Sequence, residues 1–342
     1  MRRSFILIEI KNLTKRYGKN TAVKDLSFTV ESGQVYGLLG PNGAGKSTTM
    51  NIMTGCLAAT DGQVLIDGHD IFENPVEAKK CIGYLPEIPP VYPDMTPYEY
   101  LYFVGSAKGL KGKALEADIE RVAEKTGIAD VMKRLIKNLS KGYRQRVGIA
   151  QAIIGNPQVI ILDEPTVGLD PVQIIEIRDL IKSLGKDHTV ILSSHILSEV
   201  SAVCDEILII SGGQLVACDT TENLSKILEA ENVIVIEAKG AADKIKEVLE
   251  AVSGSKKVTI TDAKTDGTVT AEIVSDKDND IREDIFNAMK NAGYPLTSLS
   301  LKQKSLEDIF LKIVSGNASE ELKEKLAGTK NSIYKKDEEA IE

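Results

Sequence analysis

Two segments at the start of the chain alternate apolar and polar residues. They are FILIEIKNLTKRYG (5–18) and TAVKDLSFTVESGQVYGLLG (21–40), and the second ends in the apolar run VYGLL. Alternation predicts half-buried strands, and the closing run predicts one fully buried strand. The pattern then predicts a helix over 47–57 and strands over 62–68 and 81–87, before a proline-rich break.

Residues 95–140 change to helical spacing. Apolar residues recur on one helical face in 96–110, 113–128 and 130–138, with glycines between the segments. We therefore predict a small helical subdomain inserted between strands.

Residues 158–217 alternate strand and helix patterns. They predict a strand over 158–165, an amphipathic helix over 171–187, a strand over 188–195 and a hairpin over 206–217. Such alternation is typical of a parallel sheet covered by helices, so the expected fold class is α/β.

The pattern changes again near Thr220. Residues 231–303 predict strand, helix, strand, strand, helix and strand, which is the order of a ferredoxin-like split βαβ unit. Residues 305–316 (SLEDIFLKIVSG) predict a closing helix, and the charged tail 317–342 is too poor in apolar residues to build a core. We expect a first domain over 1–220, an accessory α+β domain over 221–316 and a flexible tail.

Length and composition agree with two globular domains. A chain of 342 residues exceeds one compact core, and its 42% hydrophobic and 27% charged residues are ordinary for a soluble protein. The formal net charge of -8 argues against a general nucleic-acid binder, which needs a concentrated basic face. The apolar runs are strand-length and fall short of the roughly 20 residues that a membrane-spanning helix needs.

The opening MRRSFILIEI has the basic start of a signal peptide. Its apolar stretch is short and interrupted by Glu9, and no small-residue cleavage site follows, so we interpret it as a strand. The four cysteines show no CxxC spacing, which predicts reduced thiols rather than a zinc site or disulfides.

Residues 40–48, GPNGAGKST, fit the phosphate-binding pattern G-x-x-x-x-G-K-[ST] between a buried strand and a helix. Backbone N–H groups of such a loop surround phosphate oxygens, while Lys46 would reach the β- and γ-phosphates and Ser47 would ligate Mg²⁺. The alternative is an ordinary glycine-rich turn, which the flanking elements disfavour. The predicted nucleotide contacts in this loop are Gly40, Pro41, Asn42, Gly43, Ala44, Gly45, Lys46, Ser47 and Thr48.

An acid pair follows the apolar run VIIL. Asp163, at the end of this strand, would hold Mg²⁺ through water, and Glu164 would orient or deprotonate the attacking water. A solvated turn is the alternative, but four branched apolar residues before the pair make exposure of the whole segment unfavourable.

Two further residues are candidates by position. His195 closes the strand pattern VILSSH, where it would hydrogen-bond the γ-phosphate, although a lone histidine is more often structural. Tyr17 follows the first strand and would stack on adenine, although a surface tyrosine at a turn is common.

The segment LSKGYRQR (139–146) places Ser140 and Gly142 at the start of a helix beside basic Lys141 and Arg144, with no catalytic group next to them. Locally, Ser140 is explained as a helix N-cap.

Taken together, GPNGAGKST, LSKGYRQR, IILDEPTVGLDP and SSH resemble an ATP-binding cassette, the ATPase subunit of ABC transporters, over about residues 6–220. The resemblance implies that two cassettes pack head to tail, with Ser140 and Gly142 of one copy on the γ-phosphate held by the other. Asp170 would couple the two sites across the dimer.

The same resemblance implies roles for three residues. Glu164 would be the catalytic base, His195 the γ-phosphate sensor and Tyr17 the adenine stack. Lys46 completes the predicted catalytic set.

The chain departs from the family at two points. The usual LSGGQ is LSKGY here, so Lys141 and Tyr143 replace a glycine and the glutamine. The usual metal-contacting glutamine is Glu87 in GYLPE, which can still ligate the metal or accept from water but adds negative charge.

The motifs and the C-terminal unit look most like ATPase subunits of bacterial exporters of the drug-resistance, polysaccharide and gliding-motility kind. Such subunits imply a second copy, separate membrane permease subunits, a cytoplasmic position on the inner face of the membrane, and no nucleic acid. Alternatives are a soluble ATPase acting on DNA or ribosomes, or a P-loop kinase or GTPase. The accessory domain could simply steady the dimer.

Overall fold

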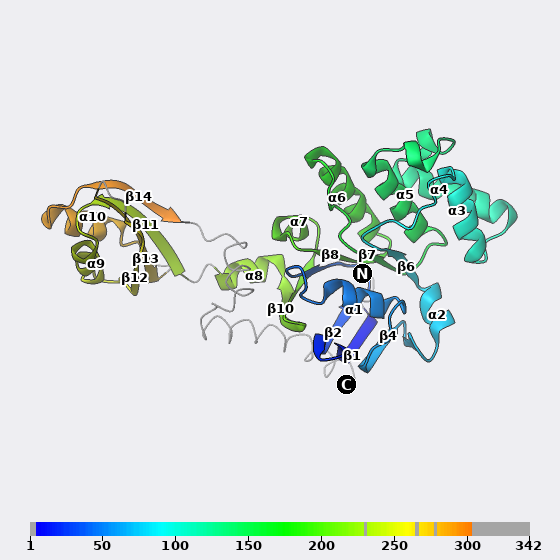
Figure 1. Ribbon diagram of the computed structural model, residues 1–342, viewed down its shortest axis with the longest axis horizontal. Coiled ribbons are helices and arrows are strands. Elements are labelled where there is room, and N and C mark those ends of the chain that lie inside the picture. Colours follow the sequence, from blue (N-terminus) through cyan, green and yellow to red (C-terminus); the bar gives the residue numbers. More distant parts are fainter. Residues whose placement is uncertain (1–4, 229–230, 264–266, 277–278, 303–342) are drawn as a thin grey trace. The chain divides into compact units, whose positions relative to one another are not determined.

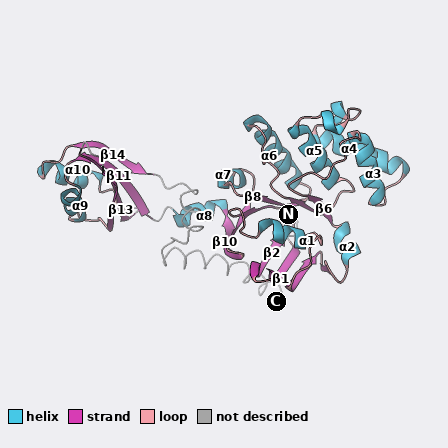
Figure 2. Ribbon diagram, viewed as in Figure 1, coloured by secondary structure: helices cyan, strands magenta, loops and turns pink. Residues whose placement is uncertain are grey.

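The computed structural model describes residues 5–228, 231–263, 267–276 and 279–302 (Figures 1 and 2). The chain divides after Thr221 into two compact units, and each is described by itself.

The first unit contains a four-stranded and a six-stranded sheet. The four-stranded sheet is antiparallel in the order β2-β1-β4-β5. Its strands are β1 (Ile6–Tyr17), β2 (Asn20–Glu31), β4 (Asp61–Ile66) and β5 (His69–Asp70).

The six-stranded sheet has the order β10-β9-β3-β8-β7-β6. Its strands are β3 (Val35–Leu39), β6 (Ile82–Leu85), β7 (Val159–Leu162), β8 (Thr189–Ser194), β9 (Glu206–Ser211) and β10 (Gln214–Thr220). All neighbours are parallel except β9 and β10, which form the predicted hairpin. Strands β3, β7 and β8 are buried along their whole length, as continuous apolar runs predict for central parallel strands.

Seven α-helices are described in the first unit before the division. They are α1 (Lys46–Met53), α2 (Pro75–Lys80), α3 (Pro97–Ala107), α4 (Gly112–Thr126), α5 (Lys141–Ile153), α6 (Pro171–Gly185) and α7 (Leu197–Ser201). Helices α3, α4 and α5 pack on one another at one side of the six-stranded sheet (Figure 1). They form the predicted helical subdomain.

Two local predictions were wrong. Residues 130–138 form no α-helix but two 3-10 turns, Ala129–Val131 and Ile136–Asn138. The backbone of this segment hydrogen-bonds to an earlier part of the chain. The N–H of Ile136 donates to the Met95 carbonyl (2.9 Å), and the N–H of Lys137 donates to the Pro93 carbonyl (3.0 Å). The helix expected over 47–57 ends at Met53, close before Gly55 at φ +65°.

The second unit contains one four-stranded antiparallel sheet in the order β12-β13-β11-β14. Along the chain its elements are β11 (Glu231–Lys239), α9 (Ala242–Glu250), β12 (Lys257–Ala263), β13 (Thr268–Asp276), α10 (Arg282–Asn291) and β14 (Leu296–Lys302). This is the predicted split βαβ order. Helix α8 (Thr221–Leu228) begins at the division between the units.

One apolar core holds the second unit together. Ile234 and Ile236 alternate along β11 toward the same face, where they join Ile245 of α9 and Ile285 of α10. Both helices therefore cover one face of the sheet. The predicted helix 305–316 and tail 317–342 lie outside the described residues.

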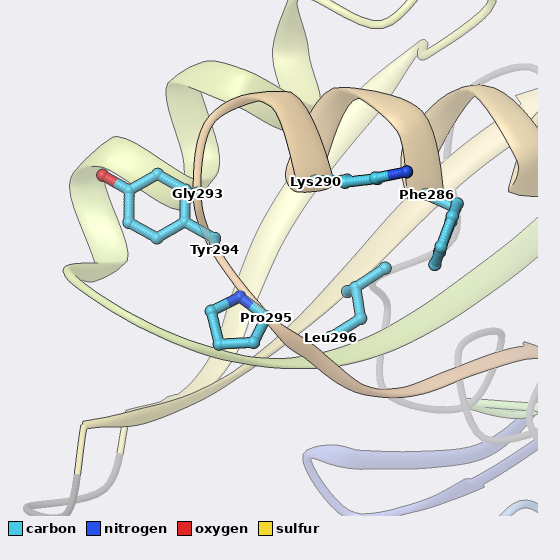
Figure 3. A pocket seen from close by; sticks show the side chains of 6 residues that line it. All are labelled: Phe286, Lys290, Gly293, Tyr294, Pro295 and Leu296. Carbon is cyan, nitrogen blue, oxygen red and sulfur yellow. The ribbon is translucent and has the colours of Figure 1, made fainter.

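A shallow groove lies where α10 passes into β14 (Figure 3). Phe286 and Lys290 of α10 and Leu296 of β14 line it, together with the linking residues 293–295. Tyr294 of this link packs on Gly240, where a Cβ would lie 2.5 Å from the tyrosine Cδ1. Only glycine fits at position 240 without moving that ring.

Candidate nucleotide-binding site

The predicted phosphate loop joins β3 to α1. Gly45 is the N-cap of α1 at φ +106°, and a Cβ there would lie 2.6 Å from the Ala22 carbonyl oxygen. A Cβ on Gly40 would lie 2.4 Å from the Ile210 carbonyl oxygen. The loop therefore needs glycine at both positions, and no described side chain caps α1. A helix N-terminus left uncapped in this way is suited to phosphate oxygens.

Lys46 is buried on the floor of this loop. Its Nζ donates to the carbonyls of Gly40 (2.8 Å) and Pro41 (3.3 Å) and lies 3.5 Å from Glu164 Oε1. The loop and the acid after β7 thus converge on one ammonium group.

Asp163 and Ser47 meet as the sequence predicted, although they come from different elements. Asp163 follows β7 and is 3% exposed, and its Oδ1 accepts from the Ser47 hydroxyl at 3.3 Å. The same oxygen accepts from the Ser193 hydroxyl of β8. Oxygen donors of this kind suit Mg²⁺, which would complete its ligands with phosphate and water.

Glu164 has a left-handed backbone, at φ +47°, which is unusual for a residue with a side chain. Its N–H donates to Ser193 Oγ at 2.9 Å, and its carboxylate lies 3.0 Å from His195 Nδ1. Because such a conformation is strained, it persists only where its surroundings hold it. Glu164 therefore sits between Lys46 and His195 in a supported, strained turn.

These groups surround one cleft. Eleven predicted residues line it: Tyr17, Pro41, Asn42, Gly43, Gly45, Lys46, Ser47, Thr48, Glu87, Glu164 and His195. Gly40, Ala44 and Asp163 are buried and are not among the residues that line the cleft. Four lining residues were not predicted: Asn20, Thr21, Ala22 and Val167.

Tyr17 is half exposed at the edge of the cleft. The Lys15 ammonium lies 5.2 Å from the centre of its ring and donates to the Ala58 carbonyl at 2.7 Å. Asn20 pairs with Tyr17 across the β1–β2 turn, which explains how Asn20, Thr21 and Ala22 reach the cleft. The pairing of the hairpin was the signal that could have identified them.

Ser140, Gly142 and Asp170 lie elsewhere, and none of them is among the residues that line this cleft. Ser140 is exposed and caps α5, where its hydroxyl accepts from the Tyr143 N–H at 3.3 Å. Asp170 caps α6 by accepting from the Gln173 N–H at 2.9 Å. A Cβ on Gly142 would lie 2.8 Å from Gln173, so the starts of α5 and α6 are neighbours.

None of the helices in the described ranges is both long and apolar enough to cross a bilayer.

Comparison with known proteins gives consistent matches. A sequence model described as "ABC transporter" matches residues 23–167. The chain is 43% identical over 212 residues to the uncharacterized ABC transporter ATP-binding protein YhcH of Bacillus subtilis, covering 61% of this chain and 68% of the relative.

It is also 30% identical over 308 residues to the linearmycin resistance ATP-binding protein LnrL of B. subtilis, covering 90% of this chain and 98% of the relative. Among solved structures, cbiO1 of Clostridium perfringens, part of the complex cbiONQ, aligns with a TM-score of 0.60 at 26% identity. That alignment covers 64% of this chain and 90% of cbiO1.

Proposed function

Because the chain belongs to the ABC transporter ATP-binding proteins, we propose that two copies close head to tail over two ATP molecules and thereby drive export through separate membrane subunits. ATP-binding subunits of this family are ATPases that work with membrane subunits. Export is proposed from the full-length match to a drug-resistance protein.

The observation that carries the proposal is the division of the site within one chain. Lys46, Ser47 and Glu164 gather at the cleft, whereas exposed Ser140 opens α5 outside it. The start of α5 carries a partial positive charge and has no acidic residue in its first turn. The phosphates of a nucleotide bound to a second copy are the anion that we assign to this helix start.

The surface beside Asp170 supports contact with a second copy. Val172 and Ile175 of α6 are 66% and 58% exposed, and their spacing puts them on one face of the helix. Exposed apolar residues next to a proposed interface are explained if pairing covers them.

At the cleft, Ser47 and the buried Asp163 that it contacts are the proposed ligands of Mg²⁺, with Glu87 at the rim as a further ligand or an acceptor for bound water. When bound, Mg²⁺ neutralises charge on the β- and γ-phosphates. Glu164 is the proposed general base, since its carboxylate lines the cleft, and His195 contacts the γ-phosphate. Tyr17 stacks on adenine.

The contact with the membrane subunits is proposed at an exposed surface of one aliphatic and four aromatic residues, Ile88, Tyr92, Tyr98, Tyr102 and Phe103. Ile88 is 81% exposed and follows Glu87 directly, while Tyr92 packs edge-on against Phe103 at 5.9 Å. The surface therefore begins at the rim of the cleft, where closure would move it. This arrangement would hold the chain at the inner face of the membrane.

The test is the concentration dependence of ATP turnover. If each site is shared, specific activity rises with protein concentration and then levels off, and Ser140→Ala lowers turnover while the ATP affinity of the single chain stays within about twofold. A diluted single chain that hydrolyses ATP at the full rate would refute the shared site. An equal loss of single-chain affinity in Ser140→Ala would refute the role of Ser140.

A further inference from the structure

A buried acid that the mechanism above does not use lies beside the site. Glu199 of the five-residue helix α7 is 8% exposed. Its Oε2 accepts from two hydroxyl groups, those of Thr166 and Ser194, and the Ser194 bond measures 3.2 Å. Both partners are themselves buried, Thr166 at 6% and Ser194 at 1% exposed.

The two hydroxyls belong to the two segments that carry the proposed catalytic groups. Thr166 lies two positions after Glu164, and Ser194 directly precedes His195. These segments leave the neighbouring parallel strands β7 and β8, where Leu162 pairs with Leu192. One carboxylate oxygen therefore ties both segments together just beyond the ends of their strands.

We propose that Glu199 is a positioning residue for ATP hydrolysis, because its carboxylate holds the turn of Glu164 and the loop of His195 in register. This assignment rests on the proposed roles of Glu164 and His195. The backbone of Glu164 is strained at φ +47°, and such a conformation needs support from its surroundings. Within the turn the Val167 N–H donates to the Glu164 carbonyl at 3.2 Å, and the Glu199–Thr166 bond fixes the same turn from outside.

A purely local role for Glu199 as the cap of α7 does not fit the contacts. A capping acid at this position would accept from the N–H of Ile196, the N-cap residue. That N–H donates instead to Ser194 Oγ at 3.0 Å. Since a carboxylate only accepts, it makes the Ser194 hydroxyl donate and leaves the hydroxyl lone pairs for Ile196.

The experiment compares Glu199→Ala and Glu199→Gln with the unaltered full-length chain at a protein concentration where specific activity has levelled off. We expect Glu199→Ala to lower kcat roughly tenfold to a hundredfold, as a displaced catalytic group does. KM and ATP affinity should stay within about twofold, since the phosphate loop and Lys46 lie outside the two segments that Glu199 holds. Glu199→Gln keeps one acceptor oxygen and should lose less.

The matched control is Asp70→Asn. Asp70 is another buried acid, 8% exposed, whose carboxylate accepts from the backbone N–H groups of Phe72 (2.8 Å) and Glu73 (3.1 Å) away from the cleft. This control should lower the unfolding temperature and leave kcat unchanged. If Glu199→Ala fails to fold, Glu199→Gln and Ser194→Ala test the same prediction, a lower kcat at nearly unchanged ATP affinity.

A second comparison separates positioning from general damage. In a Glu164→Gln background one of the two positioned groups is already altered, so Glu199→Ala should reduce the residual turnover by a smaller factor than in the unaltered chain. The same fold loss in both backgrounds, or a kcat within about twofold of the unaltered chain, would overturn the proposal. Loss of concentration dependence in the unaltered chain would overturn head-to-tail pairing instead and would leave this comparison valid.

Discussion

Ser193 is the residue at which a single hydroxyl supports both acids of the site. It is fully buried on β8, donates to Asp163 Oδ1 and accepts from the Glu164 N–H at 2.9 Å. Replacing it by alanine removes a hydrogen bond to a charged group, which is worth about 1.5–3 kcal/mol. It also leaves a buried N–H without an acceptor, which costs about 1–3 kcal/mol more.

We therefore expect Ser193→Ala to lower the free energy of unfolding of the first unit by about 2.5–6 kcal/mol. At roughly 2–4 °C per kcal/mol for a unit of this size, the unfolding temperature should fall by about 10 °C. Calorimetry of the full-length chain measures this fall. The control is Ser183→Ala, because the Ser183 hydroxyl only donates to the Leu180 carbonyl of its own helix at 2.8 Å.

The same substitution has a functional consequence. Asp163 loses a donor that fixes its orientation, and loss of such support typically weakens metal binding by roughly tenfold or more. The Mg²⁺ concentration that half-saturates ATP turnover should therefore rise in Ser193→Ala and not in Ser183→Ala. An unfolding temperature within about 2 °C of the unaltered chain, together with unchanged Mg²⁺ dependence, would refute this reasoning.

Three further predictions concern single residues. Glu164→Gln should keep ATP binding, lose roughly 10²–10⁴-fold in turnover and accumulate as an ATP-bound pair in sedimentation, whereas unchanged turnover would exclude it as the base. Tyr17→Ala should weaken ATP binding roughly five- to a hundredfold through lost stacking, with Tyr17→Phe nearly unchanged, as titration of a fluorescent ATP analogue can show. Burial lowers the pKa of His188, so below about pH 6.5 the native chain binds fewer protons than the unfolded chain. The free energy of unfolding should therefore fall as the pH falls. Denaturant titrations between pH 7 and 5 should show that the free energy of unfolding depends less on pH in His188→Gln.

The strands and the phosphate site were predictable because their signals are local. A buried parallel strand must be apolar along its whole length, so VYGLL and VIIL identify β3 and β7. A Cβ at position 40 or 45 would clash with a backbone carbonyl oxygen, so the phosphate loop requires glycine at both positions of the motif. The carboxyl ends of parallel strands meet at one edge, so Asp163 and His195 could be placed together.

The supporting residues could not be predicted, because their roles depend on contacts between distant segments. Ser193 bonds to Glu164 across 29 positions, and Thr166 bonds to Glu199 across 33. Neither serine of SSH carries a pattern that distinguishes it from a surface residue. The helix expected over 130–138 does not form for the same reason, since the N–H groups of Ile136 and Lys137 donate to carbonyls near position 95.

Lys141 shows how pairing and nucleotide binding are physically linked in this proposal. It stands at the first position of α5, where a positive charge opposes the helix dipole by about 0.3–1 kcal/mol. Among the described residues, no carboxylate oxygen lies within 4.0 Å of the Lys141 ammonium. The ammonium packs against Gly168 instead, since a Cβ built on that glycine would lie 2.1 Å from Nζ. The repulsion in the single chain becomes attraction once phosphates of a second copy reach the start of α5. By thermodynamic reciprocity, ATP then strengthens pairing by the same factor by which pairing strengthens ATP binding.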